Sequence, residues 1–227
     1  MKKKIIFTLF IIALLQNPLF ANTNNTHYDP SIVPKKMTVQ EKKQRFFALL
    51  VPAVNKVYQE LEENYLEAKK LIQKNPQDKK LLSFMQSYHA KDGDDLLKRM
   101  KPHPKSITLA QSATESAWAT SRFFRVAKNI FGVWSYNKDE PRVPASKKRG
   151  NKTIYVKKYS SIEDSIRNYY KILATGQAFA KFRDEKMKTN DPYKLVKYLD
   201  KYSERGEAYT KGLASLIRYN KLTKYDK

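Results

Sequence analysis

The segment that most constrains the fold runs from Ser106 to about Thr120 and is dense in small side chains. It follows residues 101–104, where Pro102 and Pro104 prevent a helix from continuing and so mark a boundary. Small side chains let neighbouring backbones approach closely, as they do at the centre of a domain. The sequence therefore predicts a central, buried helix that contains Ala110, Ser112, Ala113, Ser116, Ala117 and Ala119.

A long amphipathic pattern precedes this segment. Thr38 and Glu41 have the spacing of a capping box, and apolar residues then recur at helical intervals to about Gln73. Pro52 lies inside the pattern and is expected to kink or split the helix. We interpret residues 38–100 as a helical arm that supports the part of the chain that follows.

The pattern changes between residues 139 and 159. Prolines, a basic run and a Gly-Asn pair indicate turns, and Thr153–Val156 has the composition of a strand. Ser160 and Glu163 then have capping-box spacing, and Asp-Pro at 191–192 resembles an N-cap followed by a first-turn proline. The expected fold class is mainly α, with a small β-hairpin lobe.

The N-terminus has the layout of a secretory signal peptide. Lys2–Lys4 precede an apolar run from Ile5 to Leu15, and a small residue, Ala21, leads into a polar stretch. An apolar core of about 11 residues is well short of the roughly 20 that span a bilayer as a helix. We therefore expect residues 1–21 to be a cleaved signal peptide without a stable membrane span, residues 22–37 to be a flexible lead-in, and the mature chain to be exported to the periplasm or cell envelope.

The formal net charge of +23 at pH 7 favours a polyanionic partner. Nucleic acid, an anionic membrane surface and an acidic wall polymer would each satisfy such a field, and a lysine-rich surface can equally be a solvated face. The export signal argues against nucleic acid, as does the lack of a recognisable recognition motif. His27, His89 and His103 lack metal-ligand spacing and the chain has no cysteine, so we expect no metal and no cofactor.

Glu115 is the one acidic residue between Asp95 and Asp139, and it lies in the small-residue segment. Burial there would disfavour the ionised carboxylate and raise its pKa. A carboxyl group that stays protonated near neutral pH can protonate a leaving-group oxygen. Taken alone, Glu115 could equally be an ordinary helix glutamate that faces water.

The surrounding motifs resemble those of a known family. Residues 110–118 read Ala-Gln-Ser-Ala-Thr-Glu-Ser-Ala-Trp, residues 129–132 read Asn-Ile-Phe-Gly, and residues 159–161 read Tyr-Ser-Ser. Together they resemble the glucosaminidase family of peptidoglycan hydrolases. The Val-Pro pair at 143–144 is similar to the Bax-type branch of that family.

The resemblance extends from about Thr38 to Asn220. It implies a lysozyme-like (α+β) catalytic domain over residues 101–227. The chain departs from the family pattern at Ala117 and Ala119, which replace glycines, and we expect the added methyl groups to narrow the floor of the cleft.

The resemblance also implies site residues. Glu115 is the general acid, and the second carboxylate belongs to the hairpin lobe, where Glu140 is the first candidate and Asp139 its alternative; an acid before proline is also a common turn residue. Tyr209 takes the place of a tyrosine near the acid, although it could be a core aromatic. Aromatic faces stack on sugar rings, which makes four residues candidates for substrate binding: Trp118, Phe131, Trp134 and Tyr136. Of these, Trp134 and Tyr136 are preferred, because Trp118 and Phe131 could both be core residues.

These observations predict a monomeric peptidoglycan hydrolase, an endo-β-N-acetylglucosaminidase that cleaves glycan strands on the N-acetylglucosamine side. The stereochemistry stays open among inverting, retaining and substrate-assisted routes. Two alternatives also stay open: lytic transglycosylase-type cleavage, which leaves 1,6-anhydro ends, and a non-catalytic wall-binding or scaffold protein.

Overall fold

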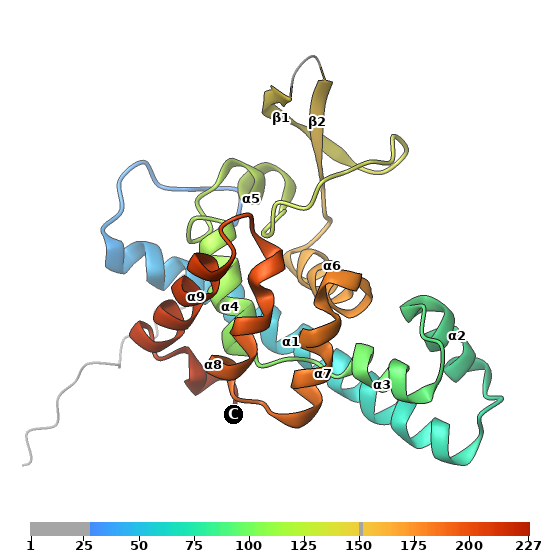
Figure 1. Cartoon of the computed structure of the whole chain (residues 1–227). Helices are drawn as coiled ribbons and strands as arrows, with labels where there is room; N and C mark the ends of the chain where they lie inside the picture. Colours follow the sequence, from blue (N-terminus) through green and yellow to red (C-terminus); the bar gives the residue numbers. More distant parts are fainter. Residues whose placement is uncertain (1–27, 150–151) are drawn as a thin grey trace, which may run out of the picture.

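The computed structural model describes residues 28–149 and 152–227, so the expected signal peptide and the first part of the lead-in lie outside the described residues. The described chain is a helical body from which one antiparallel hairpin projects (Figure 1). This arrangement confirms the predicted fold class, which is mainly α with a small β-hairpin lobe, as in a lysozyme-like domain. The helices are α1 Val39–Lys74, α2 Lys79–Tyr88, α3 Gly93–Met100, α4 Lys105–Glu115, α5 Arg122–Ala127, α6 Ile162–Thr175, α7 Ala180–Lys188, α8 Pro192–Leu195 and α9 Glu207–Tyr219, with short 3₁₀ turns η1 Gln177–Phe179, η2 Val196–Tyr202 and η3 Leu222–Tyr225.

Helix α1 begins as the sequence predicts. The Thr38 side chain accepts from the Glu41 amide and the Glu41 carboxylate accepts from the Thr38 amide, which completes the capping box. The expectation that Pro52 could split the helix was wrong, because α1 continues through it to Lys74. Proline removes one backbone donor, and the packing of the apolar face on both sides of it outweighs that loss.

The two halves of α1 belong to two hydrophobic clusters. Phe46, Leu50 and Val54 are fully or almost fully buried in the main core together with residues of α4, α6 and α9. Ala68, on the second half, packs instead with residues of α2 and α3. The division into an arm over residues 38–100 and a catalytic domain over 101–227 stays a prediction. Within the described residues, the first half of α1 packs in the same hydrophobic core as the helices of residues 101–227.

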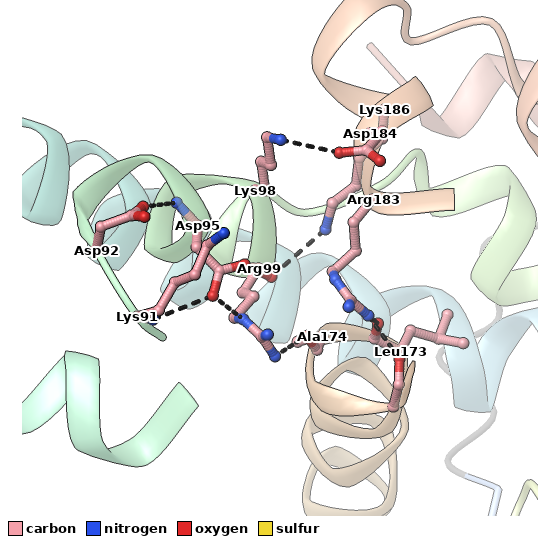
Figure 2. Close-up of polar contacts among 11 residues, drawn as sticks. Lys91, Asp92, Asp95, Lys98, Arg99, Leu173, Ala174, Arg183, Asp184 and Lys186 are labelled. Carbon is pink, nitrogen blue, oxygen red and sulfur yellow. Dashed lines mark hydrogen bonds and ion pairs between the residues drawn. The ribbon is translucent and has the colours of Figure 1, made fainter. Parts of the chain in front are cut away.

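A cluster of basic side chains joins α3, α6 and α7, and we call Arg99, Arg183 and Lys186 the cationic joint (Figure 2). Arg183 donates to the carbonyl oxygens of Leu173 and Gly176 at the end of α6, and Arg99 donates to that of Ala174. Lys186 donates to the carbonyl oxygens of Arg99 and Lys101 at the end of α3. Carbonyls at a helix C-terminus lack intrahelical donors, so the cations complete both helix ends.

The small-residue helix ends earlier than expected. Helix α4 stops at Glu115, whereas the sequence suggested that it runs to about Thr120. Three consecutive residues then adopt positive φ: Ala117 at 51°, Trp118 at 62° and Ala119 at 61°. Such left-handed positions are unfavourable for residues other than glycine. Glycine adopts such φ values without this cost, which gives a backbone reason for the glycines that the family pattern has at positions 117 and 119. The expected narrowing of the cleft floor stays a prediction.

Tertiary hydrogen bonds hold this left-handed turn. Arg45, which is 2% exposed, donates to the carbonyl oxygen of Ala119 over 2.8 Å. Its other nitrogen donates to backbone carbonyls of the chain before α1, at Asp29, Pro30 and Ile32. The Ser116 hydroxyl accepts from the Ala119 amide. Part of the expected lead-in thus contacts the same arginine that fixes the turn after Glu115.

The hairpin pairs β1 (Arg142–Arg149) with β2 (Lys152–Lys157), which confirms the strand expected at Thr153–Val156. Asn129 ties the Asn-Ile-Phe-Gly turn to β2, since its side-chain amide donates to the carbonyls of Val133 and Lys157, each at 2.9 Å. Gly132 has φ of +66°, which this tight turn requires. The turn therefore sets where the lobe leaves the helical body.

Two predicted helix starts had different outcomes. The capping box expected at Ser160 and Glu163 was wrong by one residue, because Ser161 is the N-cap of α6 and accepts from the Asp164 amide over 3.0 Å. The Asp-Pro helix start is confirmed, since the Asp191 side chain accepts from the Tyr193 amide and Pro192 opens α8.

Candidate active site

Glu115 is the last residue of α4, and its carboxyl group is fixed by a tyrosine from α9. The Tyr209 hydroxyl donates to Oε1 of Glu115 over 2.8 Å. Tyr209 is 1% exposed, so this hydroxyl has a defined place. The two residues that the sequence proposed for the acid and its neighbour are therefore in direct contact.

The second carboxyl oxygen of Glu115 is left open. Among the described residues, every buried side-chain oxygen or nitrogen has a hydrogen-bond partner. The hydrogen bond of Glu115 is made through Oε1 alone. Oε2 is consequently reached by solvent, and it is the oxygen that could meet a bound substrate.

Burial raises the pKa of Glu115 above its ordinary value. The hydrogen bond from Tyr209 and the positive charge of Arg205 act in the opposite direction and lower it. The net rise shows that the desolvation of the carboxylate is the larger effect. A glutamate in this environment keeps its proton to a higher pH than an exposed one, as an acid catalyst requires.

The surroundings of Glu140 change its pKa in the direction opposite to that of Glu115. Its carboxylate is 2.9 Å from Nζ of Lys157 on β2. Hydrogen bonds from Lys157 and Ser135 lower the pKa of Glu140. Near neutral pH, Glu140 is therefore an ionised carboxylate on the hairpin lobe.

One tyrosine lies near each of the two carboxyl groups. Burial raises the pKa of Tyr159, and the charge of Glu140 adds to this rise. Burial likewise raises the pKa of Tyr202, with further contributions from Glu115 and Tyr159. Tyr159 is therefore within electrostatic range of Glu140, and Tyr202 is within range of Glu115. Sequence reasoning missed Tyr202 as a neighbour of Glu115 and Tyr159 as a neighbour of Glu140, because no local pattern brings these segments to the two acids.

The four aromatic candidates have different surroundings. Phe131 is 5% exposed and stacks on Tyr169 with ring centroids 4.1 Å apart. Trp118 is partly buried and packs edge-on against Phe46. Both rings therefore contribute to the core, whatever contact they make with a ligand.

Trp134 and Tyr136 are 41% and 83% exposed, and their ring centroids are 6.2 Å apart. They line a groove of about 700 Å³ on the hairpin lobe, together with Lys138, Arg142 and Tyr155. An exposed aromatic pair beside basic side chains suits a sugar polymer that carries acidic groups.

Within residues 28–149 and 152–227, no group of three or more His, Asp or Glu side chains is arranged to hold a metal ion. Over the same residues, none of the helices combines the length and apolar character that crossing a membrane requires.

The segment that carries these features matches a family of glycoside hydrolases. The glucosaminidase family, described as mannosyl-glycoprotein endo-beta-N-acetylglucosaminidase, matches residues 90–222, which is more than half of the chain. The chain belongs to this family. Helices α4 and α9, which supply Glu115 and Tyr209, both lie inside the matched region, as does the hairpin.

Among individual proteins, the chain is similar to Protein bax of Escherichia coli strain K12, with 25% identity over 131 residues. That alignment covers 55% of this chain and 46% of the bax protein, so the chain spans less than half the length of that relative. The catalytic domain of the autolysin Auto from Listeria monocytogenes has 18% identity and a TM-score of 0.49, over 85% of this chain and 92% of that one. A peptidoglycan hydrolase from Sphingomonas sp. A1 has 18% identity and a TM-score of 0.45, over 63% and 91%.

Proposed function

We propose that this chain is a peptidoglycan hydrolase that cleaves the glycan strand on the N-acetylglucosamine side, with Glu115 as the general acid. The observation that carries the proposal is the carboxyl group of Glu115, whose pKa is raised by burial and which Tyr209 holds by one oxygen. The other oxygen, Oε2, is open to solvent. A protonated Oε2 can donate its hydrogen to the glycosidic oxygen as the bond to the sugar breaks.

We assign Glu140 to the second carboxylate role. Its pKa is lowered by Lys157 and Ser135, whereas burial raises that of Glu115. Two carboxyl groups whose surroundings move their pKa values apart are suited to the acid and base roles of one reaction. An ionised Glu140 would activate water or stabilise positive charge that develops on the sugar ring.

The groove of Trp134 and Tyr136 is the proposed path of the glycan on the hairpin lobe. Sugar rings would stack on the aromatic pair, while Lys138 and Arg142 would face acidic groups of the polymer. The resemblance of the N-terminus to a signal peptide supports an exported protein that meets its substrate in the cell envelope.

The pH dependence of the proposed reaction follows from these two carboxyl groups. Activity should fall as pH rises through the raised pKa of Glu115, because the acid loses its proton. It should also fall as pH decreases through the lowered pKa of Glu140, because the base gains one. A rate profile of the mature protein on purified peptidoglycan should therefore be bell-shaped. A rate that stays constant across the titration of Glu115 would contradict the acid role.

The decisive experiment is digestion of purified peptidoglycan by the mature protein and by Glu115→Gln, followed by mass analysis of the released ends. We expect Glu115→Gln to lose activity by about 100-fold or more, since general acid catalysis contributes roughly 10²–10⁴-fold. Glu185→Gln is the matched control, because Glu185 forms an exposed pair with Lys188 on α7.

Product chemistry then separates the alternatives. Hydrolysis gives reducing N-acetylglucosamine ends, while 1,6-anhydro ends would show a lytic transglycosylase. Equal release by the wild-type protein and Glu115→Gln would remove Glu115 from the reaction. If neither protein released fragments but both bound peptidoglycan equally, the chain would be a wall-binding protein.

A further inference from the structure

The hydroxyl group that holds Glu115 is itself held by buried polar side chains. Nε2 of Gln111 donates to the Tyr209 hydroxyl over 2.9 Å, and the Tyr169 hydroxyl donates to Oε1 of Gln111 over 2.5 Å. Nε2 of His103 lies 3.1 Å from the Tyr169 hydroxyl oxygen. We call His103, Tyr169, Gln111 and Tyr209 the neutral chain; all four are at most 1% exposed.

The amide of Gln111 gives this chain a direction. An amide nitrogen only donates and an amide oxygen only accepts. The Tyr209 oxygen therefore accepts from Gln111, and its single hydrogen is directed to Oε1 of Glu115. On the other side of the amide, Tyr169 has to donate to Gln111, so its own oxygen is free to accept from His103.

His103 supplies the hydrogen at the start of the chain. The Thr108 hydroxyl donates to Tyr170 over 2.8 Å and also lies 3.1 Å from Nε2 of His103. Because Thr108 has given its one hydrogen to Tyr170, it can only accept from His103. Nε2 of His103 consequently carries a hydrogen, and each member of the chain donates towards Glu115.

No member of the chain changes charge near neutral pH. Burial lowers the pKa of His103 well below its ordinary range, and nearby Lys186 adds to the effect. Burial raises the pKa of Tyr169 and of Tyr209. The direction of donation is thus the same in every state in which the site would work.

We propose that Gln111, Tyr169 and His103 are positioning residues for Glu115, because they aim the Tyr209 hydroxyl at Oε1 and leave the acidic hydrogen on Oε2. A protonated carboxyl group that accepts at one oxygen carries its hydrogen on the other. Oε2 is the oxygen that solvent reaches, so the hydrogen lies where a substrate can approach it. This inference rests on the proposed acid role of Glu115.

The same arrangement serves the state after proton transfer. When the Oε2–H bond breaks and the hydrogen moves to the glycosidic oxygen, Glu115 becomes a carboxylate that shares its negative charge with Oε1. The bond from Tyr209 then has a charged acceptor and becomes stronger. An interaction that strengthens as the charge develops favours the transition state over the bound substrate.

Gln111→Met tests the proposal, since methionine has a similar length and neither donates nor accepts like an amide. Ser112→Ala is the control: Ser112 is the next residue on α4, is fully buried, and its hydroxyl donates to the Thr108 carbonyl, which lies outside the neutral chain. Two measurements apply to each folded variant. One is the pKa of Glu115 from the ¹³C signal of its labelled carboxyl group, and the other is the pH profile of kcat and KM on soluble peptidoglycan fragments.

In Gln111→Met we expect the pKa of Glu115 to rise, because the bond from Tyr209 lowers that pKa and a hydroxyl without its donor is free to rotate. The alkaline limb of kcat should move to higher pH by the same amount. At its optimum, kcat should fall about tenfold with KM unchanged, which is the scale of one bond to a developing charge. Ser112→Ala should match the wild-type protein in both measurements.

Tyr169→Phe removes the next hydroxyl along the chain and should give the same two shifts at smaller size. It decides the question if Gln111→Met does not fold. Folded variants with a wild-type Glu115 pKa and a wild-type pH profile would overturn the proposal. Full activity of Glu115→Gln would instead overturn the acid role, and the carboxyl titration would still show whether the neutral chain orients Tyr209.

Discussion

The neutral chain behind Glu115 and the cationic joint between α3, α6 and α7 bury polar groups in different ways. The neutral chain pairs each donor with a side-chain acceptor and carries no charge near neutral pH. The cationic joint buries Arg183 and Lys186, which are 6% and 3% exposed, and holds them with backbone carbonyls rather than carboxylates. The two regions meet where Lys186 influences His103.

The two regions therefore have different roles: the neutral chain orients one hydrogen, and the cationic joint fixes helices to each other. A neutral chain of hydroxyl and amide groups sets the direction of one hydrogen without a large desolvation cost. Buried cations without a carboxylate partner are costly, and the carbonyls at two helix ends offset the cost by fixing those helices to each other. We therefore expect changes in the neutral chain to affect catalysis, and changes in the cationic joint to affect the free energy of unfolding.

The largest effect should follow from Arg183→Met. The substitution removes the guanidinium that donates to the carbonyls of Leu173 and Gly176 at the end of α6, and Gly176 keeps its bond from the Phe179 amide. We expect the free energy of unfolding to fall by about 3 kcal/mol, the scale of losing a buried charged donor. Urea unfolding measures it, with Lys181→Met, an exposed change on the same helix, as the control. A folded Arg183→Met protein with an altered Glu115 pKa would show that the two regions do not act separately.

Lys186→Met should change how stability depends on pH. Burial lowers the pKa of Lys186 to about 7, with Arg183 and Lys101 contributing, from an ordinary value of 10.5. Between these values the unfolded chain binds more protons than the folded one, so this group makes stability rise with pH. The rise should be roughly 2–3 kcal/mol between about pH 6 and about pH 9, and it should be missing in Lys186→Met.

The measurement for this second prediction is urea unfolding of both proteins at several pH values in that window. Lys181→Met again serves as the control and should keep the wild-type slope. If the free energy of unfolding of Lys186→Met and of the wild-type protein changed with pH in parallel, the pKa of Lys186 would be the same in the folded and the unfolded chain. The contrast between the two regions would then lose its electrostatic basis.

Local patterns in the sequence predicted most of the helical framework and the hairpin. The capping box at Thr38 and Glu41 and the strand composition at Thr153–Val156 act through neighbouring residues, so no tertiary contact is needed to recognise them. The error of one residue at Ser161 is of the same local kind, because Ser160 and Ser161 are adjacent and either serine could be the cap.

The site was only partly predictable for a physical reason. Glu115 was found because one acid stands out in a neutral segment. Gln111, Tyr169 and His103 become partners only when α4, α6 and the segment before α4 pack together, and each alone looks like an ordinary polar or aromatic residue. The early end of α4 was missed because its left-handed turn depends on Arg45, which is 74 residues away in sequence.

The smallest effect concerns the left-handed turn that links Glu115 to the rest of the molecule. Ala117 is exposed and has φ of 51°, so Ala117→Gly relieves strain without losing a buried contact. Removing the strain of a left-handed residue stabilises the folded chain by roughly 1–2 kcal/mol. Glycine also raises the conformational entropy of the unfolded chain, which offsets part of this, so the free energy of unfolding should rise by about 0.5–1 kcal/mol. Ala119→Gly should gain less, because Ala119 has the same conformation but is fully buried and loses a packed methyl group. Thermal unfolding of the two variants measures the difference, and a larger gain for Ala119→Gly would show that the methyl group is strained rather than packed.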